Sequence, residues 1–261
     1  MRYLIFSDVH ANWWGMHHVL RFADENSIDQ LIFLGDIIGY NGYPNECVEA
    51  LQKNNVIAIQ GNHEGLLLKH LPQSTCNSER AQYTLKVTRT VLTHTNYEYL
   101  KSLPTQLVVN SSFIIIHASF RNLYETINTP EKAYFNLKHL TQQGYHIAFF
   151  GHTHRAGVYT FQENSQQVTY TPLTKNFTLE EKGYYLINPG TAGEPRNQLP
   201  LSFLVFDTNT FSIEYYPFEL SESEEKELMR QNREVFGGFK MSRVPAQIKE
   251  KLKKIYYSLS I

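Results

Sequence analysis

The 261-residue sequence predicts an α/β protein in which a parallel β-sheet with helical connections is followed by a second sheet. Three observations lead to this fold class: short apolar segments that end at polar residues, helical segments between the first of them, and closely spaced strands after residue 156. The length allows one large or two small domains with a sizeable core. Because the 24 Lys and Arg residues are balanced by 25 Asp and Glu residues, we expect no general affinity for nucleic acids.

Five short apolar segments each run directly into a polar motif. They are residues 3–6, 31–34, 56–59, 113–116 and 147–150. Segments of this length that are rich in Ile, Val and Phe and are closed by turn residues are typical of fully buried strands. Ligands of parallel α/β sheets bind at the carboxyl ends of the strands, so we expect the five polar motifs to share one edge.

Helices are predicted between and after these strands. Their expected ranges are 12–26, 45–53, 78–103 and 130–143. Pro44 suits the first turn of the second helix, since its φ is already close to the helical value. Pro104 ends the long third helix, and Thr129 suits the N-cap of the fourth.

After residue 156 the pattern changes to closely spaced strands. The expected strands are 158–161, 168–170, 184–187, 202–206 and 211–215, of which the last two form a hairpin. We expect them to form a second sheet packed on the first. Ser221 and Glu224 form a capping box that opens a charged helix, and a further helix begins at Pro245. The sequence therefore predicts a domain over 1–220 and a helical extension over 221–261 that packs on it.

The sequence contains neither a membrane span nor a signal-peptide core. Its longest apolar runs are far shorter than the roughly 18 residues of a span, and the N-terminal run is shorter than the roughly 7–15 residues of a signal-peptide core. Cys47 and Cys76 lack a CxxC spacing and are too few for a disulfide framework, which suits a reducing compartment. We expect a cytoplasmic protein without membrane contact.

The five polar motifs together supply two Asp, one Asn and several His. In an extended chain, residues two apart point the same way, so Asp8 and His10 can face one pocket, as can His152 and His154. Oxygen ligands mixed with imidazole, and without thiolate, suit Mn, Fe, Zn or Co. Two metal ions that share a bridging carboxylate need about seven ligand positions, and the motifs supply about that number. Two cations about 3.5–4 Å apart can polarise a phosphoryl group and activate a water for in-line attack.

These motifs resemble the five blocks of the calcineurin-like metallophosphoesterase superfamily, in the same order. The matching segments are Asp8-Val9-His10, Gly35-Asp36, Gly61-Asn62-His63-Glu64, His117 and Gly151-His152-Thr153-His154. The segments Gly35 to Cys47 and Asn188 to Arg196 are similar to the small bacterial and archaeal phosphodiesterase branch of that superfamily. The resemblance extends over about residues 2–216.

The resemblance implies a four-layer α/β/β/α sandwich of two mixed β-sheets flanked by helices. It also implies two divalent ions, with Mn²⁺ expected first and Fe, Zn, Co or Ni as alternatives. One ion would be held by Asp8, His10, Asp36 and His154, and the other by Asp36, Asn62, His117 and His152, so that Asp36 bridges them. His63 would be the catalytic residue that assists the transition state or the leaving group without binding metal.

The expected function is hydrolysis of a small phosphodiester or nucleotide-type substrate by a metal-activated hydroxide. The segment after Asp36 lacks the Asp-Arg-Gly extension whose Arg grips phosphate in Ser/Thr protein phosphatases, which disfavours a phosphoprotein substrate. Tyr40, Arg155 and Arg196 are the candidate substrate-binding residues. Two alternatives remain open: a phosphomonoesterase, and an inactive binding module like the retromer subunit that shares this fold. The expected partner is a small phosphorylated molecule, and the oligomeric state is not readable from the sequence.

Overall fold

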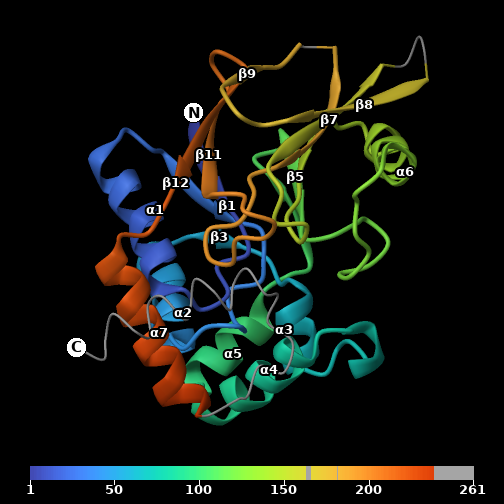
Figure 1. Cartoon of the computed structure of the whole chain (residues 1–261). Helices are drawn as coiled ribbons and strands as arrows, with labels where there is room; N and C mark the ends of the chain where they lie inside the picture. Colours follow the sequence, from blue (N-terminus) through green and yellow to red (C-terminus); the bar gives the residue numbers. More distant parts are fainter. Residues whose placement is uncertain (163–165, 181, 238–261) are drawn as a thin grey trace.

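The two sheets of the protein pack face to face, and helices cover their outer sides (Figure 1). The structure is a computed structural model that describes residues 1–162, 166–180 and 182–237. Each sheet has six strands in this part of the chain and mixes parallel with antiparallel pairs. The predicted α/β fold with two mixed sheets flanked by helices is therefore confirmed.

The first sheet has the strand order β3-β2-β1-β11-β12-β9. Its strands are β1 (Arg2–Phe6), β2 (Gln30–Phe33), β3 (Ile57–Ala58), β9 (Phe177–Thr178), β11 (Leu201–Asp207) and β12 (Ser212–Phe218). Strands β1, β2 and β3 are parallel to one another, as the alternation of strands and helices predicts. The free side of β1 pairs antiparallel with β11, so that Tyr3 lies opposite Phe206.

The second sheet has the strand order β4-β5-β6-β10-β7-β8. Its strands are β4 (Gln106–Val109), β5 (Phe113–Ile116), β6 (Ile147–Phe149), β7 (Gly157–Gln162), β8 (Gln167–Pro172) and β10 (Tyr184–Asn188). Strands β5, β6 and β10 are parallel, and the remaining pairs are antiparallel. The carboxyl ends of β5 and β6 therefore lie at one edge.

The predicted assignment of strands to sheets was wrong in two places. The β11–β12 hairpin joins the first sheet, although it was expected in the second, because β11 covers the open side of β1. Strands β5 and β6, expected to continue the first sheet, belong to the second. The short strands β4 and β9 were not predicted. Three of the four residues of β4 are exposed, so it lacks the apolar pattern of a buried strand.

The core lies in three layers, because residues along each strand alternate between its two faces. In β1, Leu4 and Phe6 pack under helices, whereas Tyr3 and Ile5 point into the space between the sheets. That inter-sheet layer contains an aromatic cluster, in which the Tyr3 and Phe113 rings lie 5.1 Å apart. Each fully buried aromatic side chain contributes about 1.5–3 kcal/mol, so this cluster is a main source of the sheet–sheet attachment.

The helices form the outer two layers. They are α1 (Trp13–Glu25), α2 (Pro44–Lys53), α3 (Asn62–Leu67), α4 (Glu79–Val91), α5 (His94–Ser102), α6 (Pro130–Gln142) and α7 (Glu222–Phe236), with a 3₁₀ turn at Gln73–Thr75. Helices α1 and α2 share a buried cluster with β1 and β11, and α6 packs on the second sheet. No helix in these described ranges is long and apolar enough to cross a membrane.

Helix ends follow the predicted capping chemistry, with one correction. The hydroxyls of Thr129 and Ser221 accept the backbone N–H groups of Lys132 and Glu224, as predicted. The single helix predicted over 78–103 is instead two helices, because Leu92 is extended and Thr93 caps α5. The helix predicted from Pro245 lies outside the described residues.

Candidate metal centre

The polar motifs from both sheets meet at one edge of the sandwich. Asp8 and His10 follow β1, Asp36 follows β2, and Asn62 and His63 open α3 directly after β3. From the second sheet, His117 follows β5, and His152 and His154 follow β6. The predicted gathering of strand ends is therefore observed, but the centre lies between two sheets and receives side chains from each.

The backbone at this edge is held in an unusual conformation. Five of the predicted metal-binding residues have positive φ, in the left-handed region: Asp8 (54°), His10 (50°), Asp36 (63°), His152 (65°) and His154 (56°). Residues other than glycine pay of order 1–3 kcal/mol for such a conformation, and it persists only where the surrounding structure holds it. Strain of this kind concentrates at functional sites, and these five candidate ligands are among the 15 non-glycine residues with positive φ in the described part of the chain.

Asp8, His10 and His154 form the first cluster, and all three are buried. The two histidine Nε2 atoms lie 3.1 Å apart, and His154 Nε2 lies 3.3 Å from Asp8 Oδ1. Each imidazole donates its Nδ1–H to a backbone carbonyl, His10 to Ile38 at 3.1 Å and His154 to Glu194 at 2.6 Å. The Nε2 lone pairs therefore face each other and a carboxylate, an arrangement that suits a cation.

Asp36, Asn62, His117 and His152 form the second cluster. His117 Nε2 lies 3.4 Å from Asp36 Oδ2 and 3.0 Å from Asn62 Oδ1, while its Nδ1 donates to the Leu34 carbonyl at 2.8 Å. The Thr126 hydroxyl, from the segment between β5 and α6, lies 3.3 Å from His152 Nε2. Thr126 thus orients a candidate ligand, although nothing in its sequence surroundings indicated that.

Asp36 lies between the two clusters. Its Oδ2 is within 4 Å of three imidazoles, at 3.8 Å from His10, 3.9 Å from His63 and 3.4 Å from His117. This position suits a carboxylate that bridges two ions. The other candidate carboxylate has an oxygen to spare, since Asp8 Oδ1 is buried and has no hydrogen-bond partner among the described residues. The bridging position of Asp36 and the free oxygen of Asp8 both suit divalent cations.

The pKa shifts of the buried side chains also favour a cation in the centre. Burial would raise the pKa of Asp36, but the neighbouring His117 and His63 outweigh it and hold that pKa well below its usual value. Burial would lower the pKa of His117, yet the charges of Asp36 and Asp8 raise it to about 9. Burial lowers the pKa of His152 to about 4. Two ionised carboxylates thus draw positive charge into a buried site that a divalent ion would also satisfy.

Glu64 holds the backbone next to the centre, and the sequence analysis assigned it no role. Its buried carboxylate accepts the backbone N–H groups of Asp36 (2.8 Å), Ile37 (3.0 Å), Ile38 (3.2 Å) and Gly61 (2.7 Å). These contacts tie the segment after β2 to the start of α3. Burial, with the nearby charge of Asp36, raises the pKa of Glu64 to about 7. A sequence signal existed, because Glu64 stands at the third position of a helix, where carboxylates cap.

His63 lies beside the centre, with its ring 4.5 Å from that of His10. Its backbone N–H donates to Asp36 Oδ1 at 2.8 Å, and its buried Nδ1 has no hydrogen-bond partner in the described part of the chain. The close approach depends on Gly39, since a Cβ there would lie 2.2 Å from His63 Nδ1. His63 also lies within 4.8 Å of ligand atoms of His10 and Asp36, so its geometry alone allows metal contact.

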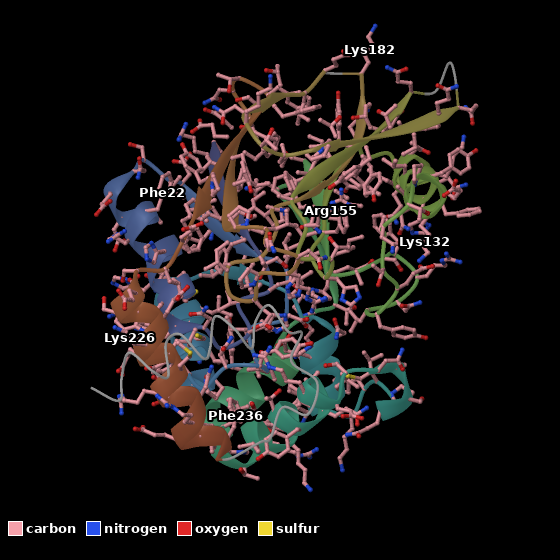
Figure 2. The ribbon with its side chains drawn as sticks, in the orientation of Figure 1. Phe22, Lys132, Arg155, Lys182, Lys226 and Phe236 are labelled. Carbon is pink, nitrogen blue, oxygen red and sulfur yellow. The ribbon has the colours of Figure 1, made fainter. Side chains whose placement is uncertain are left out.

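The three predicted substrate-binding residues lie in different surroundings. The Tyr40 ring is 4.7 Å from His10 and 4.9 Å from His63, so it walls the centre. Arg155 and Arg196 are exposed. The Arg155 guanidinium stacks on Tyr170 at 4.9 Å, and Figure 2 shows Arg155 near the middle of the view. Burial raises the pKa of Tyr40, and the Arg196 charge partly offsets this rise.

A further arginine near Tyr40 was missed by the sequence analysis. The Arg80 guanidinium lies 4.8 Å from the centre of the Tyr40 ring and is paired at 2.5 Å with Glu194. Its position on α4 gave no signal, because arginines on helices are most often surface residues.

A sandwich of two mixed sheets that gathers carboxylates and imidazoles at one edge has the architecture of the metallophosphoesterases. The chain belongs to the calcineurin-like phosphoesterase superfamily, whose domain profile matches residues 1–210. This family consists of metal-dependent phosphoric ester hydrolases, which agrees with the clustered candidate ligands. The family expected from the five motifs is therefore confirmed.

Similar proteins come from archaea and bacteria. An uncharacterized protein of Methanocaldococcus jannaschii is 28% identical over 236 residues, which cover 88% of this chain and 92% of that protein. The crystal structure of a metallophosphoesterase from Sphaerobacter thermophilus is 27% identical, with a TM-score of 0.74 and coverage of 91% and 98% of the two chains. A hypothetical protein from Pyrococcus horikoshii OT3 shares the fold, at 18% identity and a TM-score of 0.68, with coverage of 90% and 96%.

Proposed function

We propose that the protein is a bimetallic phosphoesterase that hydrolyses a small phosphodiester. Asp8, His10, Asp36 and His154 would hold one ion, and Asp36, Asn62, His117 and His152 the other. The observation that carries this proposal is the position of Asp36, whose Oδ2 lies within 4 Å of imidazoles of both clusters. When bound, two such ions supply Lewis acidity and lower the pKa of water. Mn²⁺ is the first expected metal.

His63 would act on the substrate directly. Burial lowers its pKa, an effect that Asp36 only partly offsets, so the imidazole enters the reaction neutral with a single N–H. That N–H can donate to a phosphoryl or leaving-group oxygen, while His63 stays outside the ligand set. Its Nδ1 is buried against Gly39, whereas its Nε2 lies 3.9 Å from Asp36 Oδ2 and is the nitrogen on the side of the centre.

Two features support a diester over a monoester. Ile37, Ile38 and Gly39 follow Asp36, so this segment carries no arginine to grip a dianion. Tyr40 offers an apolar wall with a polar tip beside His63, suited to the organic group on the second ester arm. A monoester dianion gains more than a diester from an additional fixed cation, and a diester needs more room.

A phosphomonoesterase is the second candidate, favoured by one observation. Arg155 and Arg196 are exposed, and neither forms a salt bridge within the described ranges, although the Arg155 guanidinium stacks on Tyr170. Both are therefore available to supply the charge that a dianion requires. An inactive binding module is less well supported, since each position implied as a ligand carries a coordinating residue and these residues meet at one edge.

The cellular location is also a proposal. Cys47 is buried, Cys76 is partly buried, and both are free thiols. This supports a reducing compartment, and we propose the cytoplasm.

Metal titration and paired substrates test the function. Calorimetric titration with Mn²⁺ should give close to two ions per chain, and Asp36→Asn should reduce both sites, whereas Asp24→Asn at an exposed position should change neither. Fewer than one ion at saturating Mn²⁺ would contradict the bimetallic centre.

With Mn²⁺ bound, kcat/KM should be higher for bis(p-nitrophenyl) phosphate than for p-nitrophenyl phosphate. A tenfold monoester preference, equivalent to about 1.4 kcal/mol of transition-state binding, would reverse the substrate class.

A further inference from the structure

Helix α7 lies against the segment that follows Asp36. The contacts come from the middle and second half of the helix: the Tyr43 hydroxyl donates to Glu227 at 3.3 Å, and Gln231 Nε2 donates to the Gly42 carbonyl at 3.0 Å. A Cβ at Gly42 would lie 3.0 Å from the Gln231 side chain, so the helix and the segment are closely packed. We call residues 39–43 the tyrosine loop, because it carries Tyr40 and Tyr43.

Asn232 makes the contact that leads into the metal centre. Its Nδ2 donates to Asn41 Oδ1 at 2.9 Å. Asn41 is buried, and both its backbone N–H (3.1 Å) and its Nδ2 (3.0 Å) donate to the backbone carbonyl of His10. Asn232, Asn41 and the His10 carbonyl therefore form a continuous chain of hydrogen bonds from the surface helix to a candidate ligand.

His10 needs such support because its backbone is strained. Both His10 and the following Ala11 have positive φ, at 50° and 54°, and neither is a glycine. A conformation of this kind persists only where neighbouring contacts hold it. The two hydrogen bonds from Asn41 act on the carbonyl between these two residues and so oppose relaxation of that peptide.

The ends of α7 are anchored on other helices. Near its start, Glu224 lies 3.1 Å from His18 Nε2 on α1, and at its end the Phe236 carbonyl accepts the Tyr83 hydroxyl of α4 at 2.6 Å. Figure 1 shows α7 running along the side of the molecule next to these helices, which agrees with its contacts to α1 and α4. The helix thus spans the tyrosine loop from two fixed points.

We propose that α7 is a positioning element of the metal centre, in which Asn232 orients Asn41 and Asn41 holds the His10 backbone. This orientation directs the His10 imidazole toward Asp8 and His154. The inference rests on the proposed function, because it takes His10 as a metal ligand. It assigns to α7 a role in metal affinity, beyond packing against its neighbours.

The test replaces the side-chain N–H donor of Asn232 with an oxygen while the shape of the side chain is kept. Asn232→Asp places an oxygen opposite Asn41 Oδ1, so the hydrogen bond is replaced by repulsion while the side-chain volume is kept. Arg233→Gln is the matched control, since it changes the net charge equally at an exposed position of the same helix. In calorimetric titrations with Mn²⁺, Asn232→Asp should weaken one of the two sites by about 10–100-fold, the usual effect of removing a group that orients a ligand. The control should leave both sites unchanged.

Hydrogen exchange of the metal-free protein gives a readout independent of activity. Amides of residues 38–43 should exchange faster in Asn232→Asp than in the wild type or in Arg233→Gln. Gly42→Ala, which pushes α7 off the loop by a different route, should produce the same pattern. If the wild type binds two ions, and both Asn232→Asp and Gly42→Ala bind them as tightly as the wild type, the positioning role is wrong and the proposed function stands. If the wild type binds no Mn²⁺, the proposed function itself fails.

Discussion

The two clusters of the centre differ in how firmly the fold holds them. In the first cluster Asp8, His10 and His154 are all buried, and both imidazoles are fixed by backbone carbonyls. In the second cluster His117 is held in the same way by the Leu34 carbonyl, but His152 is partly exposed and its Nε2 meets the side-chain hydroxyl of Thr126. A carbonyl in a strand or tight turn has little freedom, whereas a threonine hydroxyl can rotate.

This difference indicates separate tasks for the two halves. A buried set of ligands with fixed orientation loses little entropy on binding an ion, so the first cluster should bind more tightly. In the second cluster Asp36 and His117 are buried but His152 is partly exposed, so we expect this half to be the more accessible one. We therefore predict that, in the proposed bimetallic centre, the first cluster would retain its ion and the second would exchange its ion more readily, and the following predictions test that contrast.

The largest effect is expected from removing one histidine of each cluster. His154→Ala should abolish the tighter Mn²⁺ site and His152→Ala the weaker one, and each should lower kcat/KM by about 10³-fold through lost electrostatic stabilisation. Calorimetric titration with Mn²⁺ distinguishes the sites. His146→Ala serves as the control, since that histidine stacks on Tyr184 away from the centre. Loss of the same site in both variants would contradict the division into two halves.

A smaller effect on turnover is expected for His63→Ala. Both Mn²⁺ sites should remain, because Asn62 and not His63 is assigned as a ligand, while kcat should fall by about 10²-fold, at the lower end for a proton donor. The loss should shrink for diesters with good leaving groups. An equal loss for all leaving groups would assign His63 to stabilising the transition-state charge instead, and loss of an ion would place it among the ligands.

Thr126→Val should affect only the second cluster. The substitution keeps the shape of the side chain and removes the hydroxyl that lies 3.3 Å from His152 Nε2. The weaker site should lose about tenfold in Mn²⁺ affinity, toward the low end for such orienting groups, with the tighter site unchanged. Weakening of the tighter site would show that the halves are not independent.

The smallest effect is expected for Ala11→Gly beside the first cluster. Glycine removes the cost of positive φ at Ala11, about 1–2 kcal/mol, and adds about 0.5–1 kcal/mol of unfolded-state entropy. The change also removes a buried methyl group worth about 0.8 kcal/mol, so the free energy of unfolding should change by less than about 1 kcal/mol, with Mn²⁺ affinity unaltered. Chemical denaturation of the metal-free protein measures this change. A clear destabilisation would mean that the strain is not carried at Ala11.

Much of the centre could be predicted because its signals are local. A buried strand followed by a polar residue is readable within about ten residues, and parallel strands place their carboxyl ends together. Asp8, Asp36, His117 and His154 were found in this way, and the structure brings them to one edge. The caps at Thr129 and Ser221 were likewise predictable, since a helix N-terminus is satisfied by the residue that precedes it.

The misses share a different cause. The break at Leu92 and Thr93 interrupts an apolar pattern that continues on both sides, so periodicity alone favoured one helix. Thr126 and Arg80 act through neighbours from distant segments, and their own surroundings are those of ordinary surface residues. Glu64 was within a recognised motif, yet its four backbone partners come mainly from the segment after β2.

The fold class, the family and the candidate metal ligands could be predicted, because each is encoded in short apolar segments and the polar residues that close them. The grouping of strands into sheets and the side chains that support the centre became known from the three-dimensional arrangement alone. Pairing of β1 with β11, and the contact of Asn232 with Asn41, join opposite ends of the chain. Such contacts depend on the whole packing arrangement, and no local pattern specifies the partner.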